Sequence, residues 1–339
     1  MKSIVALAPA PGAGPASLAD IDLPRPMPGE RDLLVEVRAV SVNPVDVKVR
    51  SRPAAPPGSP RVLGWDAAGV VVDVGPAATL FAPGDEVYFA GDIQRPGCNS
   101  EYCLVDERIA GHKPRSLSFA EAAAMPLTTI TAYEALFERM RIPRGEGSRG
   151  KRLLVVGGAG GVGSIAIQLA KALTTTTVVA SASRPESAAW VKRMGADHVI
   201  DHRRALGPQL AGLSVPQVDY ILCTADTDPY FEALVDLVAP QGALCFIVTP
   251  KARVDLAPLH SKSAAVTWEL MYTRSMFQTA DMVEQHRLLE EVAALIDAGR
   301  VRGTLQRRLS PLCARTLAQA HALVETGTTI GKIVLEGWE

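Results

Sequence analysis

Three glycines spaced as G-x-G-x-x-G are the residues whose pattern most clearly indicates chemistry. They lie in the stretch LLVVGGAGGVGSIAIQLAK, between an expected strand and an expected helix. Glycine there permits a tight turn and close approach of a ligand, while the first N–H groups of the helix face an anion. The pattern predicts a dinucleotide pyrophosphate site, with a flexible loop that binds nothing as the alternative. The predicted contacts are Gly158, Ala159, Gly160, Gly161, Val162 and Gly163.

The end of the next expected strand indicates which dinucleotide binds. NAD sites usually place a carboxylate there, about 20 residues after the glycines, to hold the ribose 2′-hydroxyl. Here Ser183 and Arg184 occupy these positions, and the first carboxylate is Glu186. A hydroxyl and a guanidinium can hold a 2′-phosphate, so we predict NADPH. The alternative is an exposed Arg184 that caps the following helix.

The surrounding elements change character near residue 120. The first 120 residues are rich in proline and glycine, with short β-type runs that predict an antiparallel, barrel-like domain. A helical segment follows on both sides of Pro126, with Ser118 and Glu121 spaced as a capping box. Strands and helices then alternate, which predicts a parallel sheet covered by helices on both faces. The fold class is therefore α/β, with a β domain and a doubly wound domain.

Composition restricts the partners. The chain has 339 residues and a formal net charge of −1, which argues against binding to nucleic acid. No apolar stretch reaches the roughly 20 residues that cross a bilayer. The five scattered cysteines suit reduced thiols. We expect a cytoplasmic protein that acts on a small molecule, without a membrane or nucleic-acid partner.

Several segments resemble the medium-chain dehydrogenase/reductase superfamily, in its quinone oxidoreductase branch. They are NPVDVKVR, VLGWDAAGVVVDVG, GDEVYFAG, AAAMPLTTITAYEAL and GGAGGVGSIAIQLAK, and TWELMYTRSMFQT resembles the subgroup labelled zinc-type alcohol dehydrogenase-like. The resemblance implies a GroES-like catalytic domain at 1–127 and 273–339 and a Rossmann NADPH-binding domain at 128–272. It also implies a homodimer, for which pairing of the edge strand AAVTWELM is a plausible route.

The zinc ligands of that superfamily are missing from the matching positions. Zinc members supply a cysteine in the segment that here spans 43–46, and a His-Glu pair where this chain has Trp65 and Asp66. Tryptophan cannot ligate a metal, and neither segment holds a cysteine. Cys98 and Cys103 have no Cys-x-x-Cys partner. We therefore expect no metal site.

Reduction of a quinone or an α,β-unsaturated carbonyl requires less of the protein than oxidation of an alcohol, because the acceptor is already electrophilic. The resemblance supports this reaction and implies that Asn43 lies near the nicotinamide. Its amide is expected to donate to a carbonyl oxygen, or else to make a structural bond to a loop. Asp46 is expected to hold that loop. Lys48 stands where related reductases often carry a tyrosine, and is either a proton donor or an exposed lysine.

Further cofactor contacts are expected beyond the glycine turn. Thr129, by resemblance, approaches the nicotinamide; its alternative is a helix hydroxyl bonded back to the preceding turn. Thr224, Ile247 and Val248 follow strands at the carboxyl edge of the sheet. Lys332 is expected to reach the cofactor. The resemblance also gives an apolar substrate pocket, lined by some of Trp268, Tyr272 and Phe277, which are otherwise core residues.

Two other functions remain open at this point. One is an enoyl-thioester reductase of the same superfamily, which would need a long pocket or a basic groove. The other is a redox sensor that binds NADPH with little turnover, because no indispensable catalytic residue is visible in the sequence.

Overall fold

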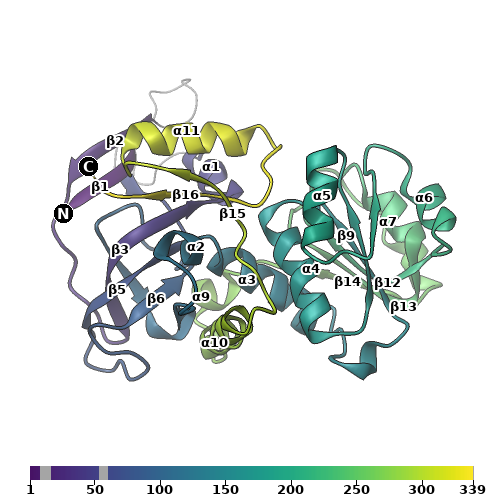
Figure 1. Cartoon of the computed structure of the whole chain (residues 1–339), viewed down its shortest axis with the longest axis horizontal. Helices are drawn as coiled ribbons and strands as arrows, with labels where there is room; N and C mark the ends of the chain where they lie inside the picture. Colours follow the sequence, from purple (N-terminus) through teal and green to yellow (C-terminus); the bar gives the residue numbers. More distant parts are fainter. Residues whose placement is uncertain (8–16, 53–59, 339) are drawn as a thin grey trace. The chain divides into compact units, whose positions relative to one another are not determined.

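The computed structural model describes residues 1–7, 17–52 and 60–338. The chain forms two compact units. Unit 1 comprises Met1–Leu127, Tyr272–Gly299 and Gly303–Glu339, and unit 2 comprises Thr128–Met271 and Arg300–Arg302. Unit 1 is thus built from both ends of the chain and unit 2 from its middle (Figure 1).

Unit 2 contains a six-stranded sheet in which all neighbouring strands are parallel. The order is β11-β10-β9-β12-β13-β14. The strands are β9 (Arg152–Val156), β10 (Thr177–Ser181), β11 (His198–Ile200), β12 (Val218–Cys223), β13 (Val238–Phe246) and β14 (Ala265–Trp268). The strand order reverses between β9 and β12, and sheets of this kind bind ligands outside the carboxyl ends at such a point. The predicted parallel sheet is confirmed.

Helices cover both faces of this sheet. Figure 1 shows α4 and α5 on one side and α6 and α7 on the other. The helices are α4 (Gly161–Leu173), α5 (Pro185–Arg193), α6 (Leu206–Gly212), α7 (Phe231–Leu237) and α8 (Ala257–His260). A further helix, α3 (Pro126–Tyr133), continues into a π-helical turn, η2 (Glu134–Arg139).

Unit 1 is built on two sheets. The larger has the order β15-β16-β3-β5-β6-β8, with β7 also paired to β3, and the smaller has the order β2-β1-β4. Apart from the parallel pair β15–β16, neighbouring strands are antiparallel. The strands are β1 (Lys2–Leu7), β2 (Ser17–Asp22), β3 (Asp32–Val42), β4 (Arg61–Val62), β5 (Ala67–Val74), β6 (Glu86–Phe89), β7 (Tyr102–Asp106), β8 (Ala110–His112), β15 (Leu305–Leu309) and β16 (Lys332–Glu336).

Five α-helices and a 3-10 helix, η1 (Glu107–Ile109), lie within unit 1 in the described part of the chain. The α-helices are α1 (Pro44–Arg50), α2 (Phe119–Ala123), α9 (Thr273–Phe277), α10 (Val283–Asp297) and α11 (Ala314–Glu325). The predicted capping box at α2 is confirmed, since Ser118 N donates to Glu121 Oε2 at 2.9 Å and Glu121 N donates to Ser118 Oγ at 3.3 Å. No helix among the described residues is long and apolar enough to cross a membrane.

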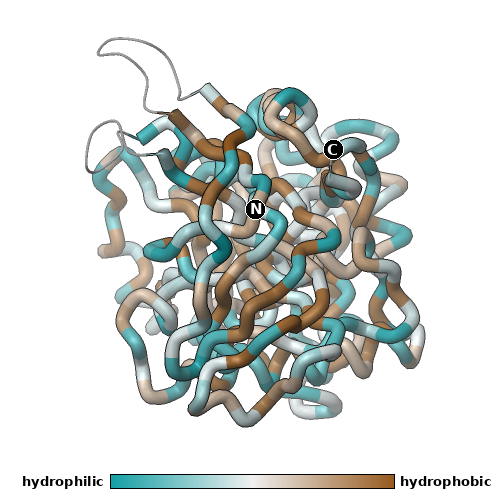
Figure 2. The backbone as a smooth tube through the Cα atoms, turned by 90° about the vertical axis from the view of Figure 1, so that its left-hand side faces the viewer, coloured by the Kyte–Doolittle hydropathy of each residue, from teal (hydrophilic) through white to brown (hydrophobic). Residues whose placement is uncertain are grey.

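The cores follow from the apolar strands. Figure 2 shows that hydrophobic and hydrophilic stretches alternate along the backbone. In unit 1, side chains from β3, β5 and β6 meet those of β7 and β16 in one buried cluster. In unit 2, a second cluster lies between β9, β12 and β13 and the helices α6 and α7. Each unit therefore has a hydrophobic core of its own.

Two elements differ from expectation. Residues expected to form a loop around Asp46 form the helix α1, which has Pro44 in its first turn and Asp46 as its third residue. Proline favours the first helical position, and an acidic residue in the first turn stabilises the helix N-terminus. The strand β15 was not predicted, because its exposed segment LQRRL has no apolar alternation.

Candidate active site

The glycine turn of unit 2 is shaped by close contacts between backbone segments. Gly157, with φ of 80°, follows the last residue of β9 and turns the chain toward α4. A Cβ atom on Gly163 would lie 2.5 Å from the carbonyl oxygen of Gly157, and one on Gly158 would lie 2.9 Å from Ala180 Cβ. Side chains at Gly158 and Gly163 are therefore excluded by the protein itself. Gly160 differs, because its Cβ would meet nothing closer than the Gly157 oxygen at 3.6 Å.

The helix that follows presents unused N–H groups at this turn. Gly160 is the N-cap residue of α4, and no side chain caps the helix there. The N–H groups of the first helical turn, which includes Gly161 and Val162, have no partner within a helix. Together with the open space at Gly160, they form a cradle that can receive the phosphates of a dinucleotide.

Residues that follow β12 and β13 lie at the same edge of the sheet as the glycine turn, because these strands run parallel to β9. Thr224 Oγ1 donates to the carbonyl of Val156 at 2.8 Å and lies 3.2 Å from that of Gly157. The carbonyl of Val248 accepts a hydrogen bond from Thr227 Oγ1. Ile247 N donates to Cys223 O at 3.3 Å. These bonds connect the ends of neighbouring strands next to the glycine turn.

The end of β10 carries the two residues expected to select the dinucleotide. Ser183 and Arg184 are both partly exposed. Arg184 is the N-cap residue of α5, and its guanidinium Nε lies 3.2 Å from the Glu186 carboxylate. A guanidinium in this position can pair with an added phosphate in place of that carboxylate.

Thr129 is buried in α3, yet its hydroxyl has no hydrogen-bond partner among the described residues. The alternative of a bond back to the preceding helical turn is therefore not observed. Buried hydroxyls are normally satisfied, so this atom has capacity for a ligand. The open cradle at Gly160 and the unpartnered Thr129 Oγ1 both fit a nicotinamide dinucleotide.

In unit 1, Asp46 fixes the start of α1. One of its carboxylate oxygens, Oδ2, accepts the backbone N–H of Asn43 at 2.6 Å. The other oxygen, Oδ1, is buried and has no partner within hydrogen-bond distance and angle among the described residues, and the backbone of Trp65 stabilises the carboxylate only slightly. Burial raises the pKa of Asp46 to about 7, because the Asn43 N–H and the charge of Lys332 compensate only part of the lost hydration.

Lys332 connects the segments that contain Asn43 and Asp66. Its Nζ lies 2.9 Å from Asp66 Oδ2, donates to Asn43 Oδ1 and lies 3.3 Å from the carbonyl of Val42. Asn43 Nδ2 also donates to Asp66 Oδ2 at 3.1 Å. Burial raises the pKa of Asp66, and Lys332 opposes that rise. The three side chains form a buried network, with the amide of Asn43 held in one orientation by both neighbours.

Sheet register explains why these distant residues meet. Asn43 follows the last residue of β3, which pairs with Ile333 of β16 and so brings Lys332 alongside. Asp66 precedes the first residue of β5, and its carbonyl accepts the N–H of Ser41 in β3. Three adjacent strands therefore present their ends at one edge of the sheet.

Lys48 lies apart from this network. It is exposed in the last turn of α1, two residues beyond the buried Asp46. Its exposure matches the alternative of a solvated lysine at that position.

The donor set does not fit zinc. The two segments in which zinc members of the superfamily carry ligands contribute Asn43 and Asp66, and both bind the Lys332 ammonium. Trp65, at the expected histidine position, donates its indole N–H to the carbonyl of Asp92 at 3.0 Å. No group of three or more His, Cys, Asp or Glu residues in the described part of the chain could hold a metal ion. The ammonium of Lys332 therefore occupies the space between Asn43 and Asp66, where a zinc ion would need its ligands.

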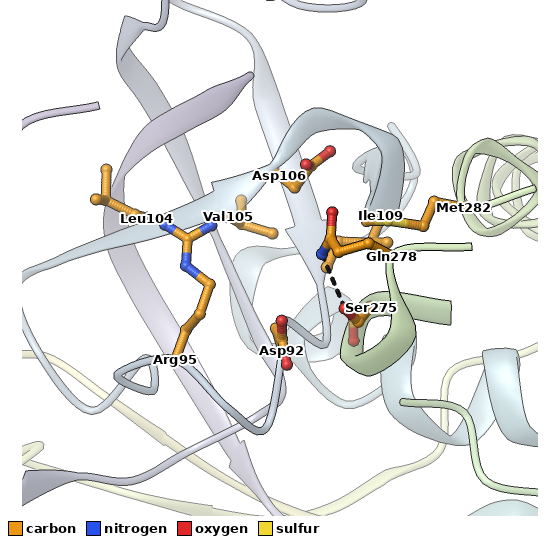
Figure 3. Close-up of a pocket in the computed structure, with 9 residues that line it drawn as sticks. All are labelled: Asp92, Arg95, Leu104, Val105, Asp106, Ile109, Ser275, Gln278 and Met282. Carbon is orange, nitrogen blue, oxygen red and sulfur yellow. Dashed lines mark hydrogen bonds between the residues drawn. The ribbon is translucent and has the colours of Figure 1, made fainter. Parts of the chain in front are cut away.

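A small pocket of unit 1 lies outside the network of Lys332, Asn43 and Asp66 and is lined by other residues. Figure 3 shows Asp92, Arg95 and Ile109 around it, with Gln278 Nε2 donating to the carbonyl of Ser275 at 2.8 Å. Its volume of about 30 Å³ corresponds to about one water molecule. The pocket is too small for a nicotinamide or a quinone.

Sequence reasoning missed two residues of these sites. From the sequence, Asp66 is indicated only as a replaced zinc position, and none of the chain's histidines is named as a site residue. His202 Nδ1 lies 3.2 Å from Ser181 Oγ, which accepts the N–H of Gly157, and burial lowers the pKa of His202. His202 follows β11, so the rule that ligands bind beyond the carboxyl ends of strands could have indicated it.

Comparisons with known proteins agree with both units. The family model for the alcohol dehydrogenase GroES-like domain matches residues 29–133, and the model for zinc-binding dehydrogenases matches residues 194–335. A zinc-type alcohol dehydrogenase-like protein of Staphylococcus aureus is 42% identical over 92% of each chain. A chloroplastic quinone-oxidoreductase of Triphysaria versicolor is 29% identical over 96% of this chain and 95% of its own.

Solved structures show the same fold. A Rhizobium etli CFN 42 protein assigned to the zinc-dependent alcohol dehydrogenases has a TM-score of 0.94 and 52% identity, covering 100% of this chain and 98% of its own. A mycobacterial protein complexed with NADPH has a TM-score of 0.82 and 27% identity, covering 99% and 100%. The predicted pairing of a GroES-like domain with a Rossmann domain is confirmed, and the chain belongs to the oxidoreductases of the medium-chain dehydrogenase/reductase superfamily.

Proposed function

We propose that this chain is a zinc-independent reductase that uses NADPH to transfer hydride to a quinone or an α,β-unsaturated carbonyl. The observation that carries the proposal is the buried ion pair of Lys332 with Asp66. An ammonium between the segments that hold zinc in related enzymes leaves no Lewis acid to activate an alcohol. An acceptor that is already electrophilic needs none.

In the proposal, unit 2 binds the cofactor and unit 1 supplies the polar groups near the substrate. We propose functional boundaries of 128–272 for the cofactor domain and of 1–127 with 273–339 for the catalytic domain. These bounds differ from those of the two compact units at Tyr272 and at Arg300–Arg302. The pyrophosphate is held by the cradle of residues 158–163. Further contacts come from Thr129, Thr224, Ile247 and Val248. When bound, the reduced nicotinamide supplies the hydride.

Arg184 and Ser183 support the choice of NADPH over NADH. Neither residue is acidic, so the ribose 2′-hydroxyl lacks the carboxylate that NAD sites usually provide. His202 lies at the neighbouring strand end, and the charge of Arg184 contributes to lowering its pKa. We propose that Arg184 pairs with the 2′-phosphate, and that Ser183 adds a hydrogen bond.

Asn43 is proposed to orient the acceptor. Its Oδ1 accepts from Lys332 and one N–H of its amide donates to Asp66, which leaves the second N–H for a carbonyl oxygen. Lys332 then acts through Asn43, by fixing which end of the amide faces the acceptor. The similarity to the Triphysaria quinone-oxidoreductase supports a quinone as one acceptor class.

We further propose a cytoplasmic homodimer. β14 lies at one edge of its sheet, and Trp268 at its end is 45% exposed. An unpaired strand edge can extend the sheet into that of a second copy. All five cysteines are unpaired and buried, which suits a reducing compartment.

The test is to follow absorbance at 340 nm with EDTA-treated protein, comparing NADPH with NADH. Each would be offered an ortho-quinone, a para-quinone, a simple enone and a crotonyl thioester. Turnover that prefers NADPH and a quinone or enone, and that survives EDTA, is the expected result. Preference for the thioester would identify an enoyl-thioester reductase. Tight NADPH binding without turnover of any acceptor would identify a sensor.

A further inference from the structure

We propose that Glu134, Arg139 and Glu269, here called the Arg139 triad, position Thr129 for the cofactor and that the two carboxyls of the triad share one proton. This inference rests on the proposed function, because it uses the proposed contact of Thr129 with the nicotinamide. All four residues belong to unit 2. The triad acts through Thr129, so its members are positioning residues.

The guanidinium of Arg139 contacts both carboxyls of the triad. Its Nε lies 2.8 Å from Glu269 Oε2, and its Nη2 lies 3.5 Å from Glu134 Oε2. The side chains of Glu269 and Glu134 are 0% and 1% exposed, whereas that of Arg139 is 31% exposed. Two acidic groups are therefore removed from water beside one guanidinium, and with both deprotonated the three side chains would carry a net negative charge.

A π-helical turn brings Glu134 and Arg139 together. The turn η2 comprises Glu134–Arg139, and the N–H of Met140 donates to the carbonyl of Ala135, five residues earlier, at 3.0 Å. In an α-helix each residue turns the chain by about 100°, so side chains five positions apart would point about 140° away from each other. The wider π turn reduces this angle, and both side chains reach Glu269. Such turns are rare and occur frequently at functional sites.

The two carboxyls of the triad also contact each other. With both deprotonated, Glu269 Oε1 has no donor among the described residues. A proton on Glu269 can form a hydrogen bond to Glu134 and makes the triad neutral. Burial, followed by the charge of Glu134, raises the pKa of Glu269 to about 9, and Arg139 opposes this rise. At neutral pH the pair therefore holds one proton.

The triad connects the helix that carries Thr129 to the strand ends of the cofactor site. Thr129 lies in α3, which continues into η2, and it stands five residues before Glu134. Glu269 follows the last residue of β14, and its N–H donates at 3.0 Å to the carbonyl of Phe246, the last residue of β13. The next residue, Ile247, is a proposed cofactor contact. The position of Thr129 relative to the end of β13 therefore depends on the triad.

Loss of the shared proton should loosen this connection. Above about pH 9 the triad becomes negative, and its two carboxylates repel each other. The Cys245 thiol of β13 is nearby but stays protonated there, because burial raises its pKa to about 12. The charge of Glu138 acts on Arg139 together with those of the triad carboxylates. We therefore expect the affinity for NADPH to fall between about pH 8 and about pH 10.

The test measures the affinities for NADPH and for 2′,5′-ADP by titration calorimetry at about pH 7.5 and about pH 10. The second ligand carries the 2′-phosphate but no nicotinamide, so it reports on the part of the site that Thr129 does not contact. Glu269→Gln keeps a donor for Glu134 and an acceptor for Arg139 but cannot titrate. The matched control is Glu146→Gln. Glu146 Oε2 accepts from Arg149 Nε at 2.6 Å in an exposed ion pair of unit 2.

In the wild type we expect the affinity for NADPH to fall by about five- to tenfold between the two pH values, the equivalent of one hydrogen bond. The affinity for 2′,5′-ADP should change by less than about twofold. In Glu269→Gln the fall for NADPH should disappear, whereas Glu146→Gln should retain it. In Thr129→Val the affinity for NADPH should be lower and should no longer depend on pH, because the group that the triad positions is gone.

An equal fall in the wild type and in Glu269→Gln would overturn the inference. A parallel fall for 2′,5′-ADP would also overturn it, since it would show a general loosening of unit 2. Persistence of the pH response in Thr129→Val would refute the action through Thr129. The proposed function fails in a different way. The wild type would then bind no NADPH at neutral pH, which would overturn both proposals, or it would show the pH response without reducing any acceptor.

Discussion

The ammonium of Lys332 lies 2.9 Å from the carboxylate of Asp66, and the two side chains are 3% and 0% exposed. Burial of either charge alone would be costly, since a charge removed from water needs a partner and hydrogen bonds. Here Asn43 bonds to both, and its amide is oriented by them. The same ion pair therefore stabilises unit 1 and holds the Asn43 amide, which we propose contacts the acceptor.

Replacement of Lys332 by methionine should destabilise unit 1 by about 3–5 kcal/mol, because it leaves Asp66 buried without its counter-charge. The matched control is Lys151→Met. Lys151 also lies 2.9 Å from an aspartate, Asp219, but its side chain is 46% exposed, so the loss should be below about 1 kcal/mol. Urea unfolding of both variants measures the difference. Equal losses would show that burial of the pair has no energetic consequence.

Substitutions in the glycine turn should separate binding from folding. In Gly160→Ala the new Cβ has an ordinary contact at 3.6 Å, so the protein should fold with nearly unchanged Tm but bind NADPH at least tenfold more weakly. In Gly163→Ala the Cβ would lie 2.5 Å from a backbone oxygen, so Tm itself should fall. Fluorescence titration and thermal unfolding measure the two effects. Wild-type affinity in Gly160→Ala would show that the cradle does not receive the cofactor.

The sequence predicted the glycine turn because its information is local. A strand, a turn and a helix follow each other within the 22 residues 152–173, and Gly158 and Gly163 each lie where the backbone leaves no room for a side chain. The parallel sheet was predicted for the same reason, since strands and helices alternate along the chain with a visible period.

The Lys332 network could not be predicted in the same way. Asp66 and Lys332 are 266 residues apart, and only the pairing of β16 and β5 with β3 brings them together. Sequence spacing carries no information on such register. Likewise, Thr129 Oγ1 and Tyr272 Oη lack a hydrogen-bond partner because of how the neighbouring segments pack in the folded chain, which local sequence does not determine.

Removal of the Arg184 guanidinium should change the cofactor preference. Arg184→Ala should weaken NADPH binding by about 10–100-fold, the equivalent of a lost charge-assisted hydrogen bond of about 1.5–3 kcal/mol. NADH, which has no 2′-phosphate, should bind as before. Glu186→Gln, which removes the carboxylate that now pairs with Arg184, should strengthen NADPH binding slightly. Titration of each variant with both dinucleotides gives the ratio, and a parallel loss for NADH would refute the assignment.

His321 should make unit 1 sensitive to acid. The residue is fully buried in α11, with Nδ1 3.3 Å from Arg50 Nη1, and burial together with the charge of Arg50 lowers its pKa to about 4. The unfolded chain binds a proton near pH 6.5 but the folded chain does not, so stability is complete above pH 6.5 and is lost as pH falls toward 4. The difference corresponds to about 3 kcal/mol. His321→Asn, which keeps an acceptor for Arg50, should flatten this pH dependence in urea unfolding. His260→Asn, at an exposed histidine, should leave it unchanged. An unaltered slope in His321→Asn would assign the acid sensitivity to other groups.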